Sequence, residues 1–334
     1  MARTKPEETK LIVFARDQLS LWEPRPEITD RMRARWPQMR AVHLPSAANL
    51  ASELPDADIV LTRALRAPEF VLGEKLKWIH SFATGVALMM YPELRQSGIE
   101  LTNAGSVHCV PIAEHVLGGL ITMARRFPDC WRYQQQGRWT QQELWNQPIR
   151  PRELRGQVLL FIGFGAIGHA VAKLVRPLEM RIWSVTRSGR PDPMAEKSFA
   201  IDKLHESLPH ADYIVLAAPD VPETRGMIGA KEIALMKPAA YFMNVARGTI
   251  VDEEALIDAL TRKAIGGAML DVTSKEPLPE DSPLWKLENA FITPHVSALS
   301  EHIWERQEEL VLENLDRWFS GRELLNRVEL ARGY

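Results

Sequence analysis

A glycine-rich segment in the middle of the chain constrains the fold more than any other feature. Gly163-Phe164-Gly165-Ala166-Ile167-Gly168 directly follows an apolar run at 158–162 and opens a helical pattern at 170–175. In a strand–turn–helix of this kind, the first glycine makes a tight turn, the second lets backbone approach a pyrophosphate, and the third allows close packing. The helix N-terminus then stabilises phosphate charge. Glycine strings also occur in surface loops, but the flanking strand and helix favour a dinucleotide site. Its expected residues are Gly163, Gly165, Ala166, Ile167 and Gly168.

The residues after the next strand bear on which dinucleotide binds. The chain reads Val185-Thr186-Arg187-Ser188 there, without the carboxylate that usually binds the ribose hydroxyls of NAD. Hydroxyl and guanidinium donors from Thr186, Arg187 and Ser188 suit a 2′-phosphate instead. The alternative interpretation of Arg187 is an ordinary solvated arginine. The segment therefore predicts NADP as the preferred cofactor, with NAD possible.

Short apolar runs alternate with helical or polar stretches along the chain, which predicts parallel α/β sheets. One series of runs lies at 11–15, 41–44, 59–61, 78–82 and 99–102, and a second series of six at 158–162, 181–185, 213–217, 241–245, 268–271 and 291–293. A buried helix is expected at 112–126 with Pro111 in its first turn, and an amphipathic helix at 300–319. With 334 residues, the chain is long enough for two domains.

The composition excludes several classes of protein. The 46% of hydrophobic and 25% of charged residues are typical of a globular chain, and a net charge of -2 lacks the positive field that nucleic acid requires. Cys109 and Cys130 are too few for a disulfide framework or a metal site, so we expect a cytoplasmic protein without a metal. The polar N-terminus predicts no secretory signal, and the apolar stretch at 116–124 is too short for a membrane span. A small molecule is the expected partner.

Three polar side chains follow the last strands of the second series. Arg247, Glu276 and His295 each come shortly after one of the last three predicted strands. Because open parallel sheets bind ligands outside the carboxyl ends of their strands, these loops could share one crevice. A guanidinium binds a carboxylate through two parallel hydrogen bonds, and an imidazole beside a carboxylate suits acid–base chemistry. This pattern indicates a site that binds a carboxylate and holds an acid–base group.

These elements together resemble the D-isomer-specific 2-hydroxyacid dehydrogenases over about residues 81–328. Seven motifs occur in the family's order, namely Thr84-Gly85-Val86, Ala113-Glu114-His115, the glycine segment, Asn244 to Asp252, Asp271 to Pro277, Ser282-Pro283-Leu284-Trp285 and Thr293-Pro294-His295. Within the family, the chain most resembles the glyoxylate and hydroxypyruvate reductases. Two positions depart from the family pattern, because Glu179 replaces a glycine and Thr186 an aspartate. The second departure again makes NAD the less favoured cofactor.

The resemblance implies an α/β fold with two doubly wound parallel-sheet domains. Residues 1–110 plus 299–334 would form a flavodoxin-like substrate domain, and residues 111–298 a Rossmann NAD(P)-binding domain. The family places the active site in the cleft between these two domains.

The resemblance also implies a reaction, the NAD(P)H-dependent reduction of a small 2-keto acid to the D-2-hydroxy acid. In the family's scheme, Arg247 binds the substrate carboxylate and keto oxygen, His295 donates the proton, and Glu276 orients His295. Asp271 is expected to bind the nicotinamide carboxamide. Backbone N–H groups would complete the carboxylate site, and they belong to Thr84, Gly85 and Val86.

Other interpretations remain open. Arg247 and Glu276 could form a structural ion pair, and His115 fits packing on its apolar helix, so it is left out of catalysis. Nothing in the sequence separates a ligand role from packing for His80 and His108. A nucleotide-sensing regulator would keep the fold without needing the three polar side chains, and a methyltransferase would use only the glycine segment. Oxidation of NAD(P)H that depends on a keto acid would distinguish these functions.

An aromatic tract at 137–145 precedes the strands of the cofactor domain and is expected on an exposed loop. Trp139 and Trp145 suit either packing in a dimer or shaping of a neighbouring subunit's substrate site. Together with the hydrophobic helix at 112–126, this tract predicts a two-fold homodimer, the commonest closed assembly.

Overall fold

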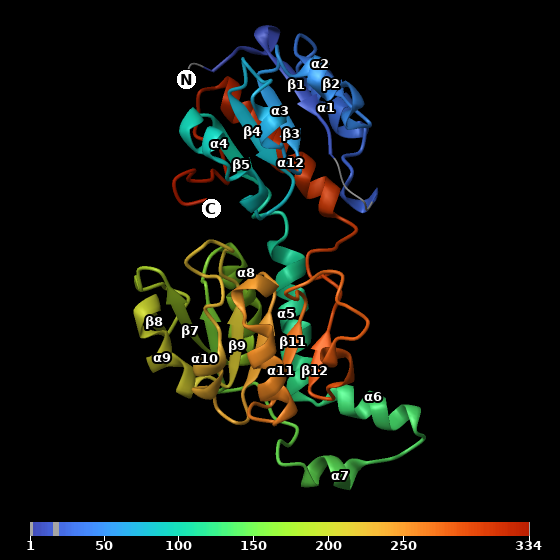
Figure 1. Cartoon of the computed structure of the whole chain (residues 1–334), viewed down its shortest axis with the longest axis vertical. Coiled ribbons are helices and arrows are strands. Elements are labelled where there is room, and N and C mark those ends of the chain that lie inside the picture. Colours follow the sequence, from blue (N-terminus) through green and yellow to red (C-terminus); the bar gives the residue numbers. More distant parts are fainter. Residues whose placement is uncertain (1–2, 16–19, 334) are drawn as a thin grey trace. The chain divides into compact units, whose positions relative to one another are not determined.

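The computed structural model of the chain describes residues 3–15 and 20–333 (Figure 1). It divides into two compact units. The first consists of the described residues up to His108 and from Ser300 onward, and the second runs from Cys109 to Leu299. The first unit is thus built from both ends of the chain, and the second from one continuous segment. The predicted domain limits at Met1 and Tyr334 lie outside the described residues.

In the described part of the first unit, five parallel strands form one sheet in the order β2-β1-β3-β4-β5. The strands are β1 Lys10–Val13, β2 Arg40–His43, β3 Ile59–Thr62, β4 Trp78–Ser81 and β5 Glu100–Asn103. This is the flavodoxin-like strand order, which confirms the predicted class of sheet. The strands lie within two residues of the apolar runs that predicted them.

Helices cover both faces of this sheet. They are α1 Glu27–Arg35, α2 Leu50–Glu53, α3 Ala67–Phe70, α4 Pro92–Ser97 and α12 Ile303–Phe319. Leu11 and Val13 of β1 pack in one cluster with α1 and α12, whereas Ile12 packs on the other face with residues of α2, α3 and α4. Burial on both faces explains why β1 is a continuous apolar run in the sequence.

The second unit contains a seven-stranded parallel sheet in the order β12-β11-β10-β9-β6-β7-β8. Its strands are β6 Val158–Ile162, β7 Arg181–Thr186, β8 Lys197–Ala200, β9 Tyr213–Leu216, β10 Tyr241–Asn244, β11 Gly267–Leu270 and β12 Ala290–Ile292. This order is that of a Rossmann sheet with one added strand. The prediction of six strands was wrong by one, because β8 was missed. As a half-exposed edge strand, β8 has no continuous apolar run that could reveal it.

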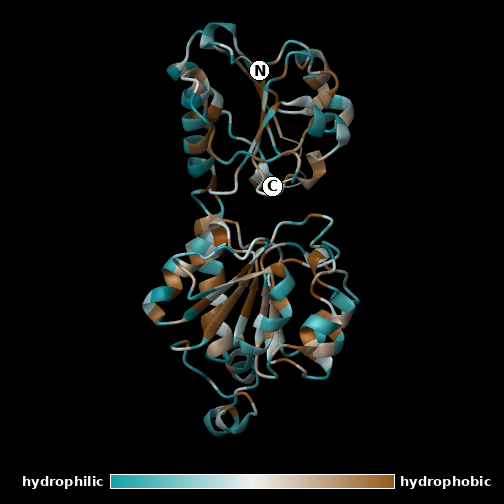
Figure 2. Ribbon diagram, turned by 90° about the vertical axis from the view of Figure 1, so that its left-hand side faces the viewer, coloured by the Kyte–Doolittle hydropathy of each residue, from teal (hydrophilic) through white to brown (hydrophobic). Residues whose placement is uncertain are grey.

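The helices of the second unit also pack on both faces of its sheet. They are α5 Cys109–Ala124, α8 Ala166–Val175, α9 Leu204–Ser207, α10 Ala230–Ala234 and α11 Glu253–Thr261. Helices α5 and α8 share one core cluster with Leu159 and Phe161, while α9, α10 and α11 share the other with Leu160. Figure 2 shows the result as hydrophobic strands between helices whose outer sides are hydrophilic. Helix α5 approaches the sheet closely at Gly119, where a Cβ would lie 2.2 Å from the sulfur of Met269.

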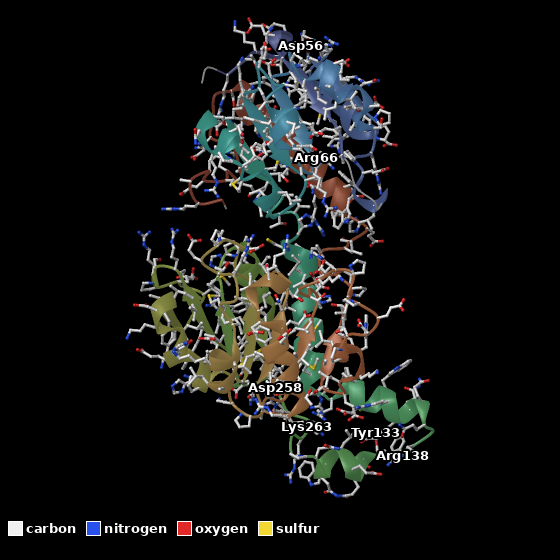
Figure 3. All side chains as sticks on the ribbon, in the orientation of Figure 1. Asp56, Arg66, Tyr133, Arg138, Asp258 and Lys263 are labelled. Carbon is white, nitrogen blue, oxygen red and sulfur yellow. The ribbon has the colours of Figure 1, made fainter. Side chains whose placement is uncertain are left out.

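Two further helices, α6 Phe127–Gln135 and α7 Gln141–Asn146, extend from this unit as an arm (Figure 1). The arm is rich in exposed aromatics, with Trp131 63%, Trp139 90% and Trp145 57% exposed. Figure 3 labels two of its other residues, Tyr133 and Arg138, whose guanidinium carbon lies 5.1 Å from the tyrosine ring centre. The prediction that the whole tract 137–145 is a loop was wrong, because Trp145 lies on α7. The stretch 141–146 contains neither glycine nor proline, so a helical turn can form there.

The described residues contain neither a membrane-spanning helix nor a metal-binding cluster. Among residues 3–15 and 20–333, no helix is long and apolar enough to cross a membrane. Across the same ranges, no group of three or more His, Cys, Asp or Glu side chains is arranged to bind a metal ion. Of the two cysteines, Cys109 is buried and Cys130 is exposed.

Candidate active site

The glycine segment forms the turn between β6 and α8. Gly163 has φ +88°, which L side chains rarely adopt, and a Cβ there would lie 2.6 Å from the Cα of Ala218 in the loop after β9. A Cβ on Gly165 would meet only open space, so a ligand can approach the backbone there. Ala166 begins α8, and with Ile167 it provides the N-terminal turn whose N–H groups have no partner within the helix. These four residues therefore form an accessible turn at a helix N-terminus.

The third glycine has a different role from the one its motif predicts. A Cβ on Gly168 would lie 2.6 Å from the ring carbon Cδ2 of Phe164, which is a residue of the same turn and is itself buried. The expected close packing of helix against strand is thus replaced by packing of the helix against the Phe164 ring. A side chain at 168 would push that ring and distort the turn.

The segment after β7 carries the residues predicted to select NADP. Thr186 is half-buried, and its Oγ1 accepts a hydrogen bond from Gly189 N at 3.1 Å. Ser188 is exposed and pairs with Ala200 of the edge strand β8 through a backbone bridge. The side chain of Arg187 is exposed on the same turn. The turn is thus fixed through its backbone while its cationic side chain reaches the surface.

Asp271 organises the loop that carries His295. Its carboxylate is buried and accepts hydrogen bonds from Thr293 Oγ1 at 2.7 Å, Val296 N at 2.9 Å and Ser297 N at 3.1 and 3.2 Å. Its backbone carbonyl also accepts from His295 N at 2.8 Å. Within this structure, the visible task of Asp271 is to shape the loop after β12. Binding of the nicotinamide carboxamide, predicted from the sequence, stays a prediction.

His295 and Glu276 form a direct pair. His295 has φ +53°, an uncommon backbone conformation for a non-glycine residue, and its N–H donates to the backbone carbonyls of Asp271 and Thr293. Nδ1 of His295 lies 2.6 Å from Oε2 of Glu276. An ionised carboxylate can only accept, so Nδ1 carries the proton in this bond and Nε2 is left for another partner. Both side chains are partly open to solvent, with 43% of His295 and 38% of Glu276 exposed.

The carboxylate of Glu276 is stabilised in its charged form. Burial on its own would raise the pKa of Glu276, but the hydrogen bond and charge of His295, the N–H of Thr273 and the charge of Arg247 lower it below its ordinary value. Thr273 N donates to Glu276 Oε1 at 3.2 Å. At neutral pH, Glu276 is therefore an anion directed at His295.

Arg247 follows β10 and is fixed mainly through its backbone. The side chain of Asn244, the last residue of β10, accepts from Ala246 N and donates to the carbonyl of Arg247, both at 3.0 Å. The half-buried guanidinium donates to the Ala246 carbonyl at 2.6 Å. Sequence reasoning identified Arg247 but not the part played by Asn244. Its position at the strand end, next to a tight loop, is the only signal in the sequence.

Gly248 joins the loop of Arg247 to the loop of Glu276. A Cβ at 248 would lie 2.0 Å from the carbonyl carbon and oxygen of Thr273, so the two backbones are in direct contact there. Residues from neighbouring strands β10 and β11 are thereby brought together at the carboxyl ends of the strands. Sequence analysis included Gly248 in a motif without recognising this contact.

His115 belongs to the same network, although the sequence suggested only packing. Its Nε2 lies 3.2 Å from Thr293 Oγ1 and 3.8 Å from Oδ1 of Asp271. Burial lowers the pKa of His115, and the charge of Asp271 opposes this only in part. The residue thus supports Asp271 and the loop of His295 from helix α5. Its spacing from those residues along the chain is too long for any sequence pattern to reveal.

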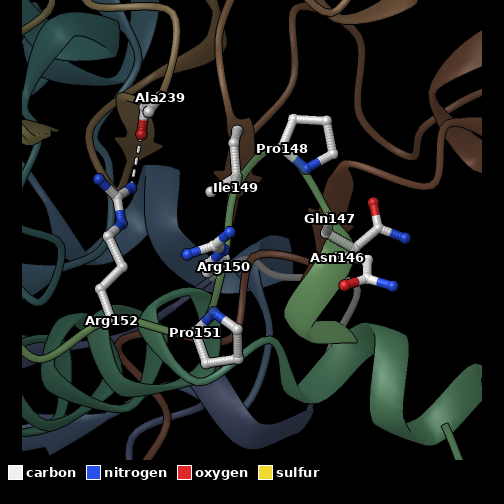
Figure 4. Close-up of a pocket in the computed structure, with 8 residues that line it drawn as sticks. All are labelled: Asn146, Gln147, Pro148, Ile149, Arg150, Pro151, Arg152 and Ala239. Atoms are coloured by element: carbon white, nitrogen blue, oxygen red, sulfur yellow. Dashed lines mark hydrogen bonds between the residues drawn. The ribbon is translucent and has the colours of Figure 1, made fainter. Parts of the chain in front are cut away.

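The remaining predicted residues belong to the first unit, and a surface pocket lies in the second. Thr84, Gly85 and Val86 follow β4 in the first unit, where Asn103 donates to the carbonyl of Thr84 at 2.8 Å. A surface pocket of about 480 Å³ is lined by residues 146–152 and Ala239, and Figure 4 shows Arg152 bonded to the Ala239 carbonyl. None of the predicted site residues lines this pocket.

Known proteins with similar sequences share this domain. Residues 117–297 match the model of the D-isomer specific 2-hydroxyacid dehydrogenase NAD-binding domain. The match confirms the predicted class of cofactor. A glyoxylate reductase of Thermococcus gammatolerans is 31% identical over 288 residues, which cover 86% of this chain and 86% of that protein. A glyoxylate reductase of Korarchaeum cryptofilum is 33% identical over 275 residues, covering 81% and 82%.

Solved structures extend the similarity to nearly the whole chain. A D-isomer specific 2-hydroxyacid dehydrogenase from Xanthobacter autotrophicus, in complex with NADPH and MES, has a TM-score of 0.83 and 25% identity, covering 98% of this chain and 100% of that one. An NADPH-dependent glyoxylate/hydroxypyruvate reductase from Sinorhizobium meliloti, in complex with NADP and malonate, has a TM-score of 0.75 and 26% identity, covering 97% and 98%. Domain model, sequence relatives and fold agree, and the chain therefore belongs to the NAD(P)-dependent oxidoreductases of the D-isomer specific 2-hydroxyacid dehydrogenase family.

Proposed function

We propose that this protein reduces a small 2-keto acid of the glyoxylate or hydroxypyruvate type to the D-2-hydroxy acid, with NADPH as the preferred reductant. The observation that carries the proposal is the pair of His295 and Glu276 beside the loop of Arg247, at the carboxyl ends of neighbouring parallel strands. An acid–base group, its carboxylate partner and a carboxylate-binding cation are what such a reduction needs. The names of the sequence relatives support this substrate class.

The second unit has a turn that fits a dinucleotide. A pyrophosphate fits at the N-terminus of α8, because Gly163 allows the tight turn there and the space beside Gly165 is open. When bound, the nicotinamide supplies the hydride that reduces the keto carbon. We assign the cofactor to the unit from Cys109 to Leu299 on this ground, and the substrate domain to the other unit.

His295 is the proposed proton donor. As the keto oxygen gains negative charge, Nε2 of a protonated His295 gives it a proton, while Nδ1 keeps its bond to Glu276. The anionic Glu276 accepts the hydrogen bond from Nδ1 and thereby fixes the direction of the ring. A positioned acid of this kind contributes a factor on the order of a hundred to ten thousand in rate.

Arg247 is the proposed ligand of the substrate carboxylate and keto oxygen. Its planar guanidinium can form two parallel hydrogen bonds with a carboxylate, and its backbone is already fixed by Asn244. We further propose, from the family resemblance, that backbone N–H groups of Thr84, Gly85 and Val86 bind the same carboxylate.

The preference for NADPH rests on the turn after β7. Arg187 is exposed there beside Ser188, and no carboxylate stands at 185–188 to repel a phosphate. The NADPH and NADP complexes of the similar structures support this choice.

Initial rates of NADPH and NADH oxidation with a panel of keto acids test the function. We expect turnover with glyoxylate or hydroxypyruvate above that with pyruvate or longer 2-keto acids, and higher kcat/KM with NADPH than with NADH. Chiral analysis of the product should find the D-isomer when hydroxypyruvate is the substrate. Binding of the dinucleotide without any turnover would favour the nucleotide-sensing regulator instead.

We also propose that the protein is a homodimer in the cytoplasm. The exposed aromatics Trp131, Trp139 and Trp145 of the arm form a surface that a second copy would cover. The chain has only two cysteines, which suits a reducing compartment. Sedimentation at micromolar concentration should give twice the chain mass, and a monomer there would contradict the assembly.

A further inference from the structure

The helix that carries the glycine turn is linked directly to the loop after β7. His169, the fourth residue of α8, places its Nε2 2.8 Å from Oδ2 of Asp192. Asp192 lies between β7 and β8, in the segment that begins with Arg187. The imidazole and carboxylate are 41% and 23% exposed, so neither is a core residue retained for packing alone.

Asp192 anchors its own segment at several points. Its Oδ1 accepts from Met194 N at 2.9 Å, and its backbone N donates to Ser198 Oγ of β8 at 3.3 Å. Ser198 is bonded in turn to the buried Ser184 of β7 at 3.0 Å. Because both carboxylate oxygens are engaged, the negative charge of Asp192 is directed at His169 and a backbone N–H.

On its other side, His169 contacts the glycine turn. The ring of Phe164, which occupies the space below Gly168, lies 4.9 Å from the imidazole in an edge-to-face arrangement with an interplanar angle of 79°. A continuous line of contacts therefore runs from the proposed pyrophosphate turn through Phe164 and His169 to Asp192. One end of this line is the turn proposed to bind the pyrophosphate, and the other end lies on the loop that carries Arg187, the residue proposed to bind the 2′-phosphate.

We propose that His169 and Asp192 are positioning residues that fix the loop of Arg187 for the 2′-phosphate and so contribute to the selection of NADPH over NADH. The inference rests on the proposed preference for NADPH. Near the cation-bearing turn, an unengaged Asp192 carboxylate would repel a phosphate and could pair with an arginine meant for it. The bond to His169 leaves the charge of Asp192 in place, but it holds the carboxylate in one position, keeps it from pairing with that arginine, and ties the loop to α8. NADH lacks the 2′-phosphate, so its binding gains nothing from the position of Arg187 and depends less on this loop.

The test compares His169→Phe, which keeps an aromatic ring beside Phe164 but cannot bond to Asp192, with His169→Gln, which can. Loss of one hydrogen bond predicts a rise of about two- to tenfold in KM and Kd for NADPH in the phenylalanine variant. The values for NADH and the kcat with either cofactor should not change. His169→Gln should restore most of the affinity for NADPH. Adenosine 2′,5′-bisphosphate, titrated against the enzyme, should follow NADPH, whereas 5′-AMP should be unaffected.

A matched control comes from another histidine of the same unit. His205 is 43% exposed, and its Nε2 lies 2.7 Å from Glu232, far along the chain from the cofactor turn. His205→Phe should leave both cofactors unaffected. Equal weakening of NADPH and NADH by His169→Phe, or an unchanged ratio between them, would overturn the inference while leaving the proposed function intact. If the wild type had equal kcat/KM for NADH and NADPH, the proposed preference would be overturned, and this inference with it.

Discussion

Replacing Gly248 with alanine would make a methyl group clash with the backbone of the loop that carries Glu276. The new Cβ would lie 2.0 Å from the carbonyl carbon and oxygen of Thr273, whereas real Cβ atoms do not approach closer than 3.0 Å. The two backbones must therefore separate by at least about 1 Å. Because Thr273 N is bonded to Glu276, the displacement passes to the partner of His295, while Arg247 remains with the other loop.

A misplacement of about 1 Å in an active site costs about a hundredfold in rate. We therefore expect Gly248→Ala to lower kcat/KM for the keto acid by about a hundredfold. Overpacking of this kind also costs about 1–3 kcal/mol of stability, so the melting temperature should fall by several degrees. Affinity for NADPH should change little, because the glycine turn follows another strand, β6.

Initial rates, circular dichroism and a fluorescence titration with NADPH measure these three effects. Gly229→Ala is the matched control, because its Cβ would come no nearer than 3.5 Å to its surroundings and would be tolerated. A folded Gly248→Ala protein that binds NADPH and keeps kcat/KM within a few-fold of the wild type would refute the reasoning. It would mean that Arg247 and Glu276 need no fixed separation.

Four other predictions use the same assays. His295→Ala should lower kcat by about a hundredfold or more without unfolding, and near-normal turnover would remove its role as proton donor. Arg247→Lys should raise KM for the keto acid and lower kcat without changing cofactor affinity, because an ammonium group cannot form two parallel hydrogen bonds with a carboxylate. An effect on cofactor affinity alone would contradict this role. Arg187→Ala should abolish most of an NADPH preference of roughly ten- to a hundredfold, and that preference should shrink with added salt. The pKa of Glu276 is lowered in the folded protein, so its stabilising effect is complete above its ordinary value of 4.5 and is lost as pH falls through the lower folded value. The difference in melting temperature between wild type and Glu276→Gln should therefore persist at pH 5 to 7 and disappear only in stronger acid.

The sequence was sufficient to predict strands that helices cover on both faces of the sheet. The central strand β6 is apolar at every position and was predicted with its observed limits, because parallel strands lie between two layers of helices. The edge strand β8 has only one covered side and gave no such pattern. Helix α7 was missed for a related reason, since its exposed residues carry no apolar period.

The sequence predicted the residues of the candidate site. It did not predict the backbone contacts and hydrogen bonds that hold them in place. Arg247, Glu276 and His295 stand at strand ends, where open sheets bind ligands, and this placement follows from the order of elements alone. The contact of Gly248 with Thr273 and the bonds of Asp271 to the loop of His295 depend on backbone paths that no local pattern encodes. The pair of His169 and Asp192 is likewise visible only in three dimensions.

The division of the first unit between the two ends of the chain has a consequence for biosynthesis. The residues of α12, among them Leu315 and Trp318, cover the same face of the sheet as Leu11 and Val13 of β1. On the ribosome, helix α1 can cover part of that face early, but the part that α12 covers stays exposed until residues 300–334 have emerged. The continuous unit from Cys109 to Leu299 can meanwhile complete its own sheet. The sheet that contains β1 is therefore begun before the continuous unit and completed after it. Until α12 is available, its apolar face is a part of the nascent protein that a chaperone would protect.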